Sequence, residues 1–523
     1  MGLGVLPDRH LSDVPGTAFL TEKGLPSSLE SVPEDDHAGL KHDPTGKIVL
    51  VPQPSDDPND PLNWPRWKKE MFTISFVFGC GCVGAIGPLL GPAFVPLAET
   101  FDVPLQKFSL GFTGSLLITL AVGNLFCNSL AMMIGKRPVY LITAVGLLAS
   151  TIWAATAKDF ISLSLSRAVQ GFCMSPMEAL VPASIADVCT DSSRPAGAII
   201  NNYGYKTCLW GMAGAFALEL VLTFFFMPET AYKRSTDTRI SASTHQEKSF
   251  AVEDGKECIS EVENRPSVSD NAPIPERHSF LYELRPWNGY YDSSGFWYSM
   301  IAPFKMLGSP VVIWGCFQLT ICVAWLVMLA STLSQIFTGP PYNFSVAQVG
   351  LTNLSSFVGT AIATALAGYM VDGLATYMSK KNNGIYEPEF RLPILALLTT
   401  LTGGGFFGWG QSLSTAQPWA IPVVLCLLLV NLGVQFGIVG VVSYVVDSHR
   451  HEAVEAFGMM SFTKNIFAFS LTFYMNDWIA IQGVRDAFFV VAGITMAISM
   501  VTIPMYIYGK RARSFAFRHG FLQ

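Results

Sequence analysis

Charged residues are scarce in this chain of 523 residues. They make up 14% of it, whereas apolar residues make up 50%; a soluble domain carries about 25% charged residues. The charges also gather in residues 1–70 and 233–300, so that the other 385 residues hold only 18 basic and 16 acidic side chains. So few charges exclude a soluble protein of this size and a nucleic-acid binder with a basic surface. The composition predicts a polytopic membrane protein with two hydrophilic segments.

Histidine and paired cysteine are absent from the places where cofactor chemistry needs them. All eight histidines lie outside the long apolar runs, which excludes the haem or metal ligation of a membrane redox enzyme. The ten cysteines include no CxxC pair, and most stand in apolar runs, where a free cysteine behaves as a small hydrophobe. We therefore expect no cofactor, no metal site and no enzymatic activity.

Long apolar runs supply eleven candidate membrane spans, each near the 20 or so residues that a spanning helix needs. Such runs must be α-helices, because lipid offers no partner for backbone polar groups. The candidates are residues 71–97, 109–133, 138–157, 160–188, 207–227, 311–336, 346–371, 392–411, 419–446, 456–475 and 486–508.

The spans divide the chain into two unequal halves. We expect a largely disordered cytoplasmic tail over 1–70, a bundle of five spans over 71–232 and a cytoplasmic linker over 233–300. A bundle of six spans over 301–510 and a short tail over 511–523 follow. The N-terminus shows no signal peptide. Lysine and arginine favour cytoplasmic loops, and they place both termini in the cytoplasm, as judged from Arg66, Lys68, Lys69, Lys136, Arg137, Lys233, Arg234, Lys380, Lys381, Arg391, Lys510, Arg511 and Arg513.

This orientation conflicts with the number of spans in the first half. The span 160–188 should end in the cytoplasm, and Lys233 and Arg234 should also lie there. The chain between them must therefore cross the membrane an even number of times. Only 207–227 can cross, because residues 189–206 contain Asp191, Arg194 and Lys206. Each such charge costs about 2.5–3.5 kcal/mol at the centre of a membrane.

Several motifs spread over both halves carry a family resemblance. They are DDPNDPLNWPRWKK (56–69), GKRPVYL (135–141), SRAVQGF (166–172), PMEALVPASIADV (176–188), FFFMPETAYKR (224–234), NNGIYEPEFRLP (382–393) and YVVDS (444–448). With them the chain resembles the major facilitator superfamily, and most closely its fungal drug:proton antiporter branch. The resemblance implies an all-α fold of two six-helix bundles related by a pseudo-two-fold axis. The chain departs from it by lacking most of the fifth helix, which carries the antiporter motif.

Two charged residues in the fourth span are the first candidates for proton coupling. Arg167, with Gln170 and Gly171, matches a position that the family implicates in coupling, although a structural hydrogen bond would also explain it. Glu178 follows eleven residues later, on about the same helix face and roughly 16 Å along the axis. It could be a protonatable site, a contact for a cationic substrate, or one partner of a structural ion pair.

Three further residues stand in other spans. Glu219 lies in the middle of 207–227 and could carry a proton, or could have lost its natural neighbour with the missing helix. Lys464 and Asn465 lie in 456–475, where the lysine could bind an anionic substrate or a carboxylate, or extend toward the cytoplasmic end. Gln318 and Gln435 could line a cavity or bind neighbouring helices together.

The remaining candidates lie in loops. Gly135, Lys136 and Arg137 match the family's conformational latch. The position of the latch's usual acidic residue, three residues before the glycine, holds Met132 in this chain. Asp372 is a possible counterpart in the second half. The basic pair could also serve only as a topology signal. Asn343 begins a glycosylation sequon in a predicted outer loop.

The resemblance implies a proton-coupled efflux carrier for small organic compounds such as drugs, toxins or secondary metabolites. Its substrate would bind between the bundles and would cross by alternating access. We expect a monomer in the lipid bilayer of the plasma membrane that binds a small molecule and protons and no nucleic acid. A nutrient importer of the same fold, and a transport-defective or sensor-type membrane protein that results from the missing span, are the alternatives.

Overall fold

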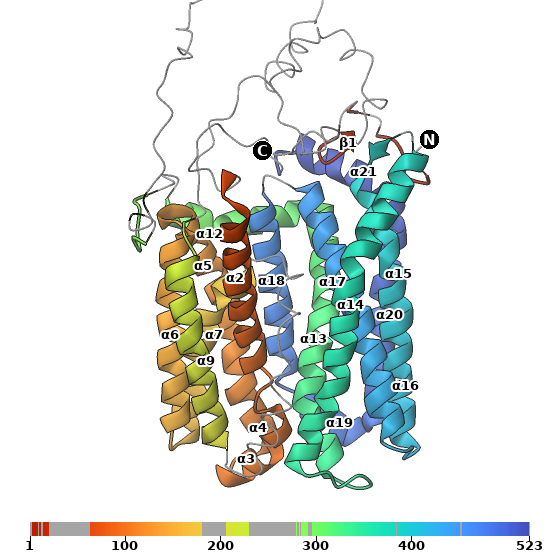
Figure 1. Cartoon of the computed structure of the whole chain (residues 1–523). Helices are drawn as coiled ribbons and strands as arrows, with labels where there is room; N and C mark the ends of the chain where they lie inside the picture. The colour runs from red at the N-terminus through yellow and green to blue at the C-terminus, as the bar shows by residue number, and fades with distance from the viewer. Residues whose placement is uncertain are drawn as a thin grey trace, which may run out of the picture.

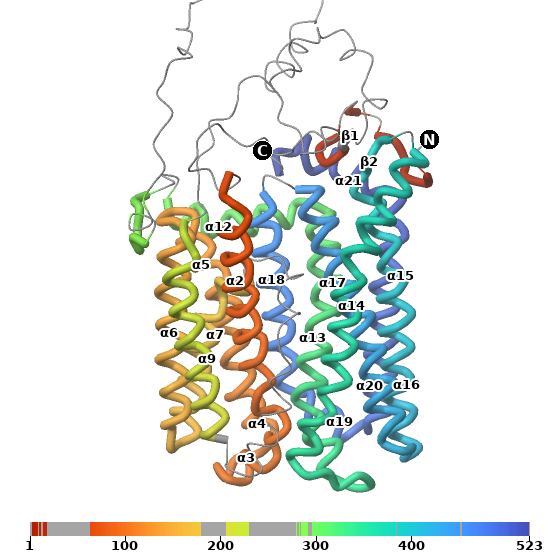
Figure 2. The backbone as a smooth tube through the Cα atoms, in the orientation of Figure 1, coloured from red at the N-terminus to blue at the C-terminus, as the bar shows by residue number. Residues whose placement is uncertain are grey.

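A computed structural model describes most of the chain. It covers residues 3–19 without 9, 12 and 13, residues 63–179 and 205–229, residues 279, 282 and 284–290, and residues 295–521 without 383, 450 and 451. These residues form two helical bundles that stand side by side (Figure 1). Both termini lie at one end of the molecule, which we call the terminal face (Figure 2).

The first bundle consists of five long helices and four short helical segments. Its elements are α2 (Arg66–Ile86), η3 (Gly91–Ala93), α3 (Phe94–Thr100), α4 (Leu105–Ser109), η4 (Leu110–Gly114), α5 (Ser115–Ile134), α6 (Lys136–Thr156), α7 (Phe160–Ala179) and α9 (Tyr205–Phe226). Helix α12 (Phe296–Lys305) follows, lies against α5 at the terminal face and leads through η7 (Met306–Gly308) into the second bundle.

The second bundle contains six spans, three of which are built from more than one helical segment. Its elements are α13 (Pro310–Thr338), α14 (Val346–Lys381), β2 (Ile385–Tyr386), η8 (Pro388–Ile394), α15 (Leu395–Leu397), η9 (Leu398–Thr402), α16 (Gly403–Ser414), η10 (Ile421–Cys426), α17 (Leu427–Ser448), α18 (Ala453–Leu471), α19 (Met475–Gln482), α20 (Val484–Met500) and α21 (Thr502–Arg518). A short strand near the N-terminus, β1 (Ala18–Phe19), pairs antiparallel with β2.

The eleven predicted spans coincide with helical segments wherever the structure describes them, which confirms the all-α polytopic fold. For the span 160–188 the described part ends at 179. Nine of the helices that the structure describes are long and apolar enough to cross a membrane. The two other spans, α7 and α18, are the helices that carry Arg167, Glu178 and Lys464. The fold therefore places intramembrane charge on helices at the contact between the bundles, where neighbouring helices can shield it from lipid.

The directions of the helices bear on the predicted five-span half. Arg137, at the start of α6, donates to the backbone oxygens of Phe224 and Met227, so α9 ends at the terminal face. Trp153, near the end of α6, donates to Ser162 at the start of α7, so α7 begins at the opposite face. Helices α7 and α9 therefore run in the same direction. Residues 180–204 lie outside the described part, and the absence of a fifth helix stays a prediction.

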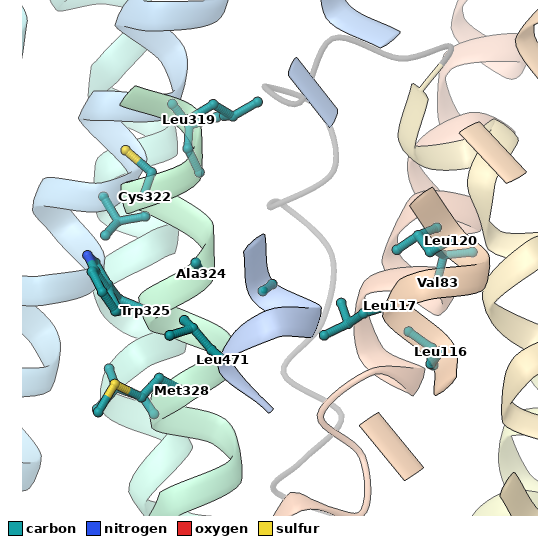
Figure 3. Close-up of a cluster of buried hydrophobic side chains, with 14 of the residues drawn as sticks. Val83, Leu116, Leu117, Leu120, Leu319, Cys322, Ala324, Trp325, Met328 and Leu471 are labelled. Carbon is teal, nitrogen blue, oxygen red and sulfur yellow. The ribbon is translucent and has the colours of Figure 1, made fainter. Parts of the chain in front are cut away.

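The two bundles meet along α5 and α18, with α7 beside them. Gly171 lets α7 approach α5 closely, because a side chain at this position would overlap the backbone oxygen of Leu116. Apolar side chains from both bundles gather near this contact: Figure 3 shows Val83, Leu116, Leu117 and Leu120 from the first bundle opposite Leu319, Cys322, Trp325 and Met328 of α13, with Leu471 of α18 also labelled.

Candidate functional site

A buried charge pair joins the two bundles. The Lys464 ammonium of α18 forms an ion pair with the Glu178 carboxylate of α7, although 286 residues separate them in the sequence. Asn465 of α18 and Asn124 of α5 donate to the second carboxylate oxygen of Glu178, at 2.9 and 3.0 Å. The sequence predicted three of these four residues as candidates. It missed Asn124, although a lone amide in the apolar run of 115–127 is a visible signal.

The surroundings make this pair sensitive to the loss of either charge. The side chain of Lys464 is 10% exposed and that of Glu178 is 20% exposed. Charges taken out of water cost several kcal/mol each, and only mutual attraction and hydrogen bonds offset that cost. The three donors on Glu178 provide this compensation. Lys464 was predicted to bind an anionic substrate or a carboxylate, or to extend toward the cytoplasmic end. The structure shows it in contact with the Glu178 carboxylate.

Arg167 lies elsewhere on α7 and contacts the interior of the first bundle. Its Nη1 donates to the backbone oxygen of Ile86 at 3.1 Å and to Gln170 Oε1 at 2.9 Å, and the guanidinium stacks on the Phe112 ring. Gln170 donates in turn to Thr151 of α6 at 2.7 Å. Within the described residues no hydrogen bond connects Arg167 with Glu178. Arg167 and Glu178 were predicted to share one face of α7. In the structure Arg167 contacts residues within the first bundle, whereas Glu178 contacts α18 and α5.

Glu219 is fully buried on α9. Neither carboxylate oxygen has a hydrogen-bond partner among the residues that the structure describes. The helix α2 comes close here, because a side-chain carbon added at Gly79 would lie 3.2 Å from Glu219 Oε1. A carboxyl group without a partner favours its neutral form inside the membrane.

The two candidate glutamines differ in their contacts. Gln318 of α13 donates to the backbone oxygen of Ile498 and to Thr502 Oγ1, both at 3.0 Å. It therefore binds helices of the second bundle together, which is the structural alternative considered for it. Gln435 of α17 is buried, and its amide nitrogen has no partner among the described residues.

The sequence that forms both bundles matches a known family. The family model of the Major Facilitator Superfamily matches residues 72–197 and 195–472. The chain belongs to the major facilitator superfamily. Members of this superfamily are membrane transporters, and this chain is accordingly a transporter and not an enzyme.

The most similar relatives of this superfamily member include fungal transporters that match nearly its whole length. An uncharacterized MFS-type transporter of Schizosaccharomyces pombe is 25% identical and covers 97% of this chain and 94% of its own length. The MFS-type transporter penM of Penicillium rubens is 24% identical, with coverage of 95% and 96%. The cercosporin MFS transporter CTB4 of Cercospora nicotianae is 22% identical, with coverage of 88% and 87%.

Solved structures give the same fold. The proton:xylose symporter XylE, bound to 6-bromo-6-deoxy-D-glucose, superposes with a TM-score of 0.53 at 14% identity. The match covers 84% of this chain and 95% of the symporter. It supports the two-bundle architecture of the superfamily.

The latch motif of this superfamily member finds an acidic partner that the sequence did not indicate. Glu229, just after α9, accepts hydrogen bonds from the backbone N–H groups of Lys136 and Arg137 at 3.0 and 3.1 Å. The Arg137 guanidinium donates to the backbone oxygens at the end of α9 and to Leu284 at 3.3 Å. Gly135, with φ +93°, makes the turn between α5 and α6. Lys136 and Arg137 thus bind α6 to α9 through Glu229 and the end of α9. Met132, which stands at the position of the family's usual acidic partner, carries no charge.

The second bundle carries a corresponding charged chain at the terminal face. Arg391 pairs with Asp372 at 3.1 Å and with Asp447 at 2.7 Å. Tyr386 donates to Asp447 and accepts from Arg391 Nε. Burial, and then the neighbouring Asp447, raise the pKa of Tyr386, so its phenol keeps the proton that it donates. Asp372 thus pairs with Arg391 at the terminal face, and its role as a latch residue stays a prediction.

The glycosylation candidate lies on the opposite face. Asn343 is exposed in the loop between α13 and α14, with φ +48°. The face opposite the termini is the one at which an outer loop is expected (Figure 1).

Proposed function

We propose that this transporter exports small, largely apolar organic compounds in exchange for protons, and that Glu178 is the coupling carboxylate. The observation that carries the proposal is the Glu178–Lys464 ion pair between the bundles. Its attraction favours the state in which α7 and α18 lie together. Protonation of Glu178 removes the negative charge and leaves the ammonium without a counter-ion, which favours separation of the helices. One proton then changes the relative stability of two arrangements, as coupled transport requires.

The chemistry of the bundle contact supports an apolar substrate. Leucine, valine, methionine and tryptophan side chains of α2, α5, α13 and α18 gather there (Figure 3). Binding sites for small organic molecules are mostly apolar, with a few polar groups that fix orientation. Asn124 and Asn465 would provide such groups. A relative named for cercosporin, an organic small molecule, fits this substrate class.

The proposal includes an orientation and a location. The terminal face carries the basic residues near the span ends, including Lys136, Arg137 and Lys510, so this face lies in the cytoplasm by the positive-inside rule. We place the protein in the plasma membrane as a monomer, with the linker 233–300 in the cytoplasm.

Transport in reconstituted vesicles tests the proposal. Purified protein in proteoliposomes is given an inward or outward pH gradient, and accumulation of the dye rhodamine 6G is followed together with internal pH. We expect wild type to accumulate dye against its gradient only when protons can move in the opposite direction. Glu178→Gln should lose gradient-driven accumulation but keep dye exchange in the absence of a pH gradient, because its bundles can still move.

Glu219→Gln is the matched control, since it neutralises another buried carboxyl group in the same bundle. This variant should keep proton-driven accumulation. If Glu178→Gln transports as well as wild type while Glu219→Gln does not, the coupling carboxylate is misassigned. Dye that moves in the same direction as protons would refute export by exchange.

A further inference from the structure

The N-terminal residues 3–19 lie on the terminal face of the second bundle. They contact β2 and Glu387, about 370 residues later in the sequence, and α21, about 500 residues later (Figure 2). The sequence predicted a tail over 1–70 and gave no indication of this contact. The contact does not involve the Glu178–Lys464 pair.

Hydrogen bonds to the backbone hold both ends of the segment. The N–H of Leu6 donates to the backbone oxygen of Ile507 at 3.0 Å, and the Tyr506 hydroxyl donates to the backbone oxygen of Leu3 at 2.7 Å. At the other end, Ala18 pairs with Tyr386 and Phe19 with Ile385 in the β1–β2 ladder. Addition of a strand to an exposed edge is a recurrent mode of peptide recognition, in which main-chain bonds supply affinity.

Side chains of the segment add specificity to these backbone bonds. Val5 and Val14 are 6% and 2% exposed, so both are buried anchors nine positions apart. Between them, Asp8 accepts a hydrogen bond from Ser514 Oγ at 2.7 Å. Thr17 donates to Glu387 Oε2 at 3.0 Å. The ligand is thus a short segment with two buried apolar residues, Val5 and Val14, and a carboxylate, Asp8, that accepts a hydrogen bond from the surface.

A buried arginine forms the base of this contact. Arg513 of α21 is fully buried and pairs with Glu387 and Glu389 at 2.9 and 2.8 Å. It also donates to the backbone oxygen of Pro15. Gly16 follows with φ +90°, and a side-chain carbon there would lie 2.9 Å from the Asp447 backbone oxygen and 3.1 Å from Arg513 Nη1. Only glycine satisfies both the conformation and the space.

We propose that the terminal face of the second bundle is a peptide-binding surface and that its ligand is residues 3–19 of the same chain. The surface consists of β2, Arg513 with its two glutamates, and the 506–514 part of α21. The bound segment holds α21 against the connection between α14 and α16. Because the contacts come from both backbone and buried side chains, the segment binds as a unit and is removed as a unit.

Hydrogen exchange on the full chain in lipid nanodiscs tests the proposal. In wild type, the backbone amides of residues 5, 6, 8 and 16–19 should exchange at least about tenfold more slowly than those of a free peptide of residues 3–19. Gly16→Val should abolish this protection and also speed exchange at 385–386 and 506–514. Gly289→Val is the matched control, since Gly289 also has positive φ but no atom within 4 Å of an added side-chain carbon. It should leave protection unchanged.

A peptide added in trans provides the second measurement. A fluorescent peptide of residues 3–19 should bind a chain that lacks residues 1–19, and its Gly16→Val form should bind at least about tenfold more weakly. Wild type should bind the peptide less well than the truncated chain, because its own segment occupies the surface. Equal exchange in wild type and Gly16→Val, or equal peptide binding by the wild-type and truncated chains, would overturn the proposal.

Discussion

Removal of either partner of the Glu178–Lys464 pair should destabilise the protein far more than removal of both. Lys464→Met leaves a carboxylate that is only 20% exposed with two amide donors and no counter-ion. Glu178→Gln leaves a 10% exposed ammonium without its partner. Breaking a buried pair from one side costs about 3–5 kcal/mol, whereas apolar or neutral replacement of both partners is often close to neutral. We expect about 3 kcal/mol for each single variant and about 1 kcal/mol for the double variant.

A thiol-reactive dye provides the assay, because all eight cysteines in the described residues are buried and become reactive on unfolding. The double-mutant cycle should give a coupling free energy of at least about 3 kcal/mol. Asp372→Asn serves as the control for an exposed pair, since the side chain of Asp372 is 70% exposed and its loss should cost under about 1 kcal/mol. If the effects of Glu178→Gln and Lys464→Met simply add, the two charges do not interact as described.

Four other predictions concern separate parts of the molecule. Burial lowers the pKa of His449 from 6.5 to about 4. The unfolded chain therefore binds the proton more tightly than the folded chain does. As the pH falls from 6.5 to 4, the free energy of unfolding should decrease by about 3 kcal/mol. His449→Gln should flatten this pH dependence in the thiol assay and keep the bond to Ser309. Gly171→Ala should lower stability by about 1–3 kcal/mol through overlap with Leu116, and an unchanged melting temperature would contradict the close contact of α7 and α5. Arg137→Ala should cost about 2 kcal/mol, because it leaves carbonyl groups at the end of α9 without their donor; Arg137→Lys should recover only part of this loss. Asn343→Gln should abolish any shift in gel mobility caused by a glycosidase, which tests the sequon directly.

The sequence predicted the helices well because lipid requires them. A run such as 311–336 has no alternative to a helix, and charges in apolar runs, such as Glu178 and Lys464, identify themselves as candidates. The pairing of these two residues could not be predicted, because it depends on how helices 286 residues apart pack. Gln318 illustrates another limit: the sequence left open whether it lines a cavity or binds helices together, and its contacts with Ile498 and Thr502 are of the second kind.

Other contacts escaped prediction because their local signals were weak. Glu229 lies 93 residues from Lys136, whereas the motif places its acidic partner three residues before Gly135, at Met132. The apolar residues of 3–19 are interrupted by proline, glycine and charged residues and follow no strand or helix period, so nothing in their pattern suggests a docked strand. The burial of Val5 and Val14 could not be predicted, because it depends on the position of this segment beside Arg513 and β2 in the folded chain.

The contact between residues 3–19 and α21 has a consequence for biosynthesis. The ribosome makes the segment before any of the spans, yet its binding partners, Tyr506, Arg513 and Ser514, are made after nearly all of them. The segment must therefore remain unbound through almost the whole of translation and membrane insertion. A nascent chain that stops before α21 displays an unbound N-terminal peptide, which a chaperone or protease could recognise. Formation of this contact would then distinguish a full-length chain from a truncated one.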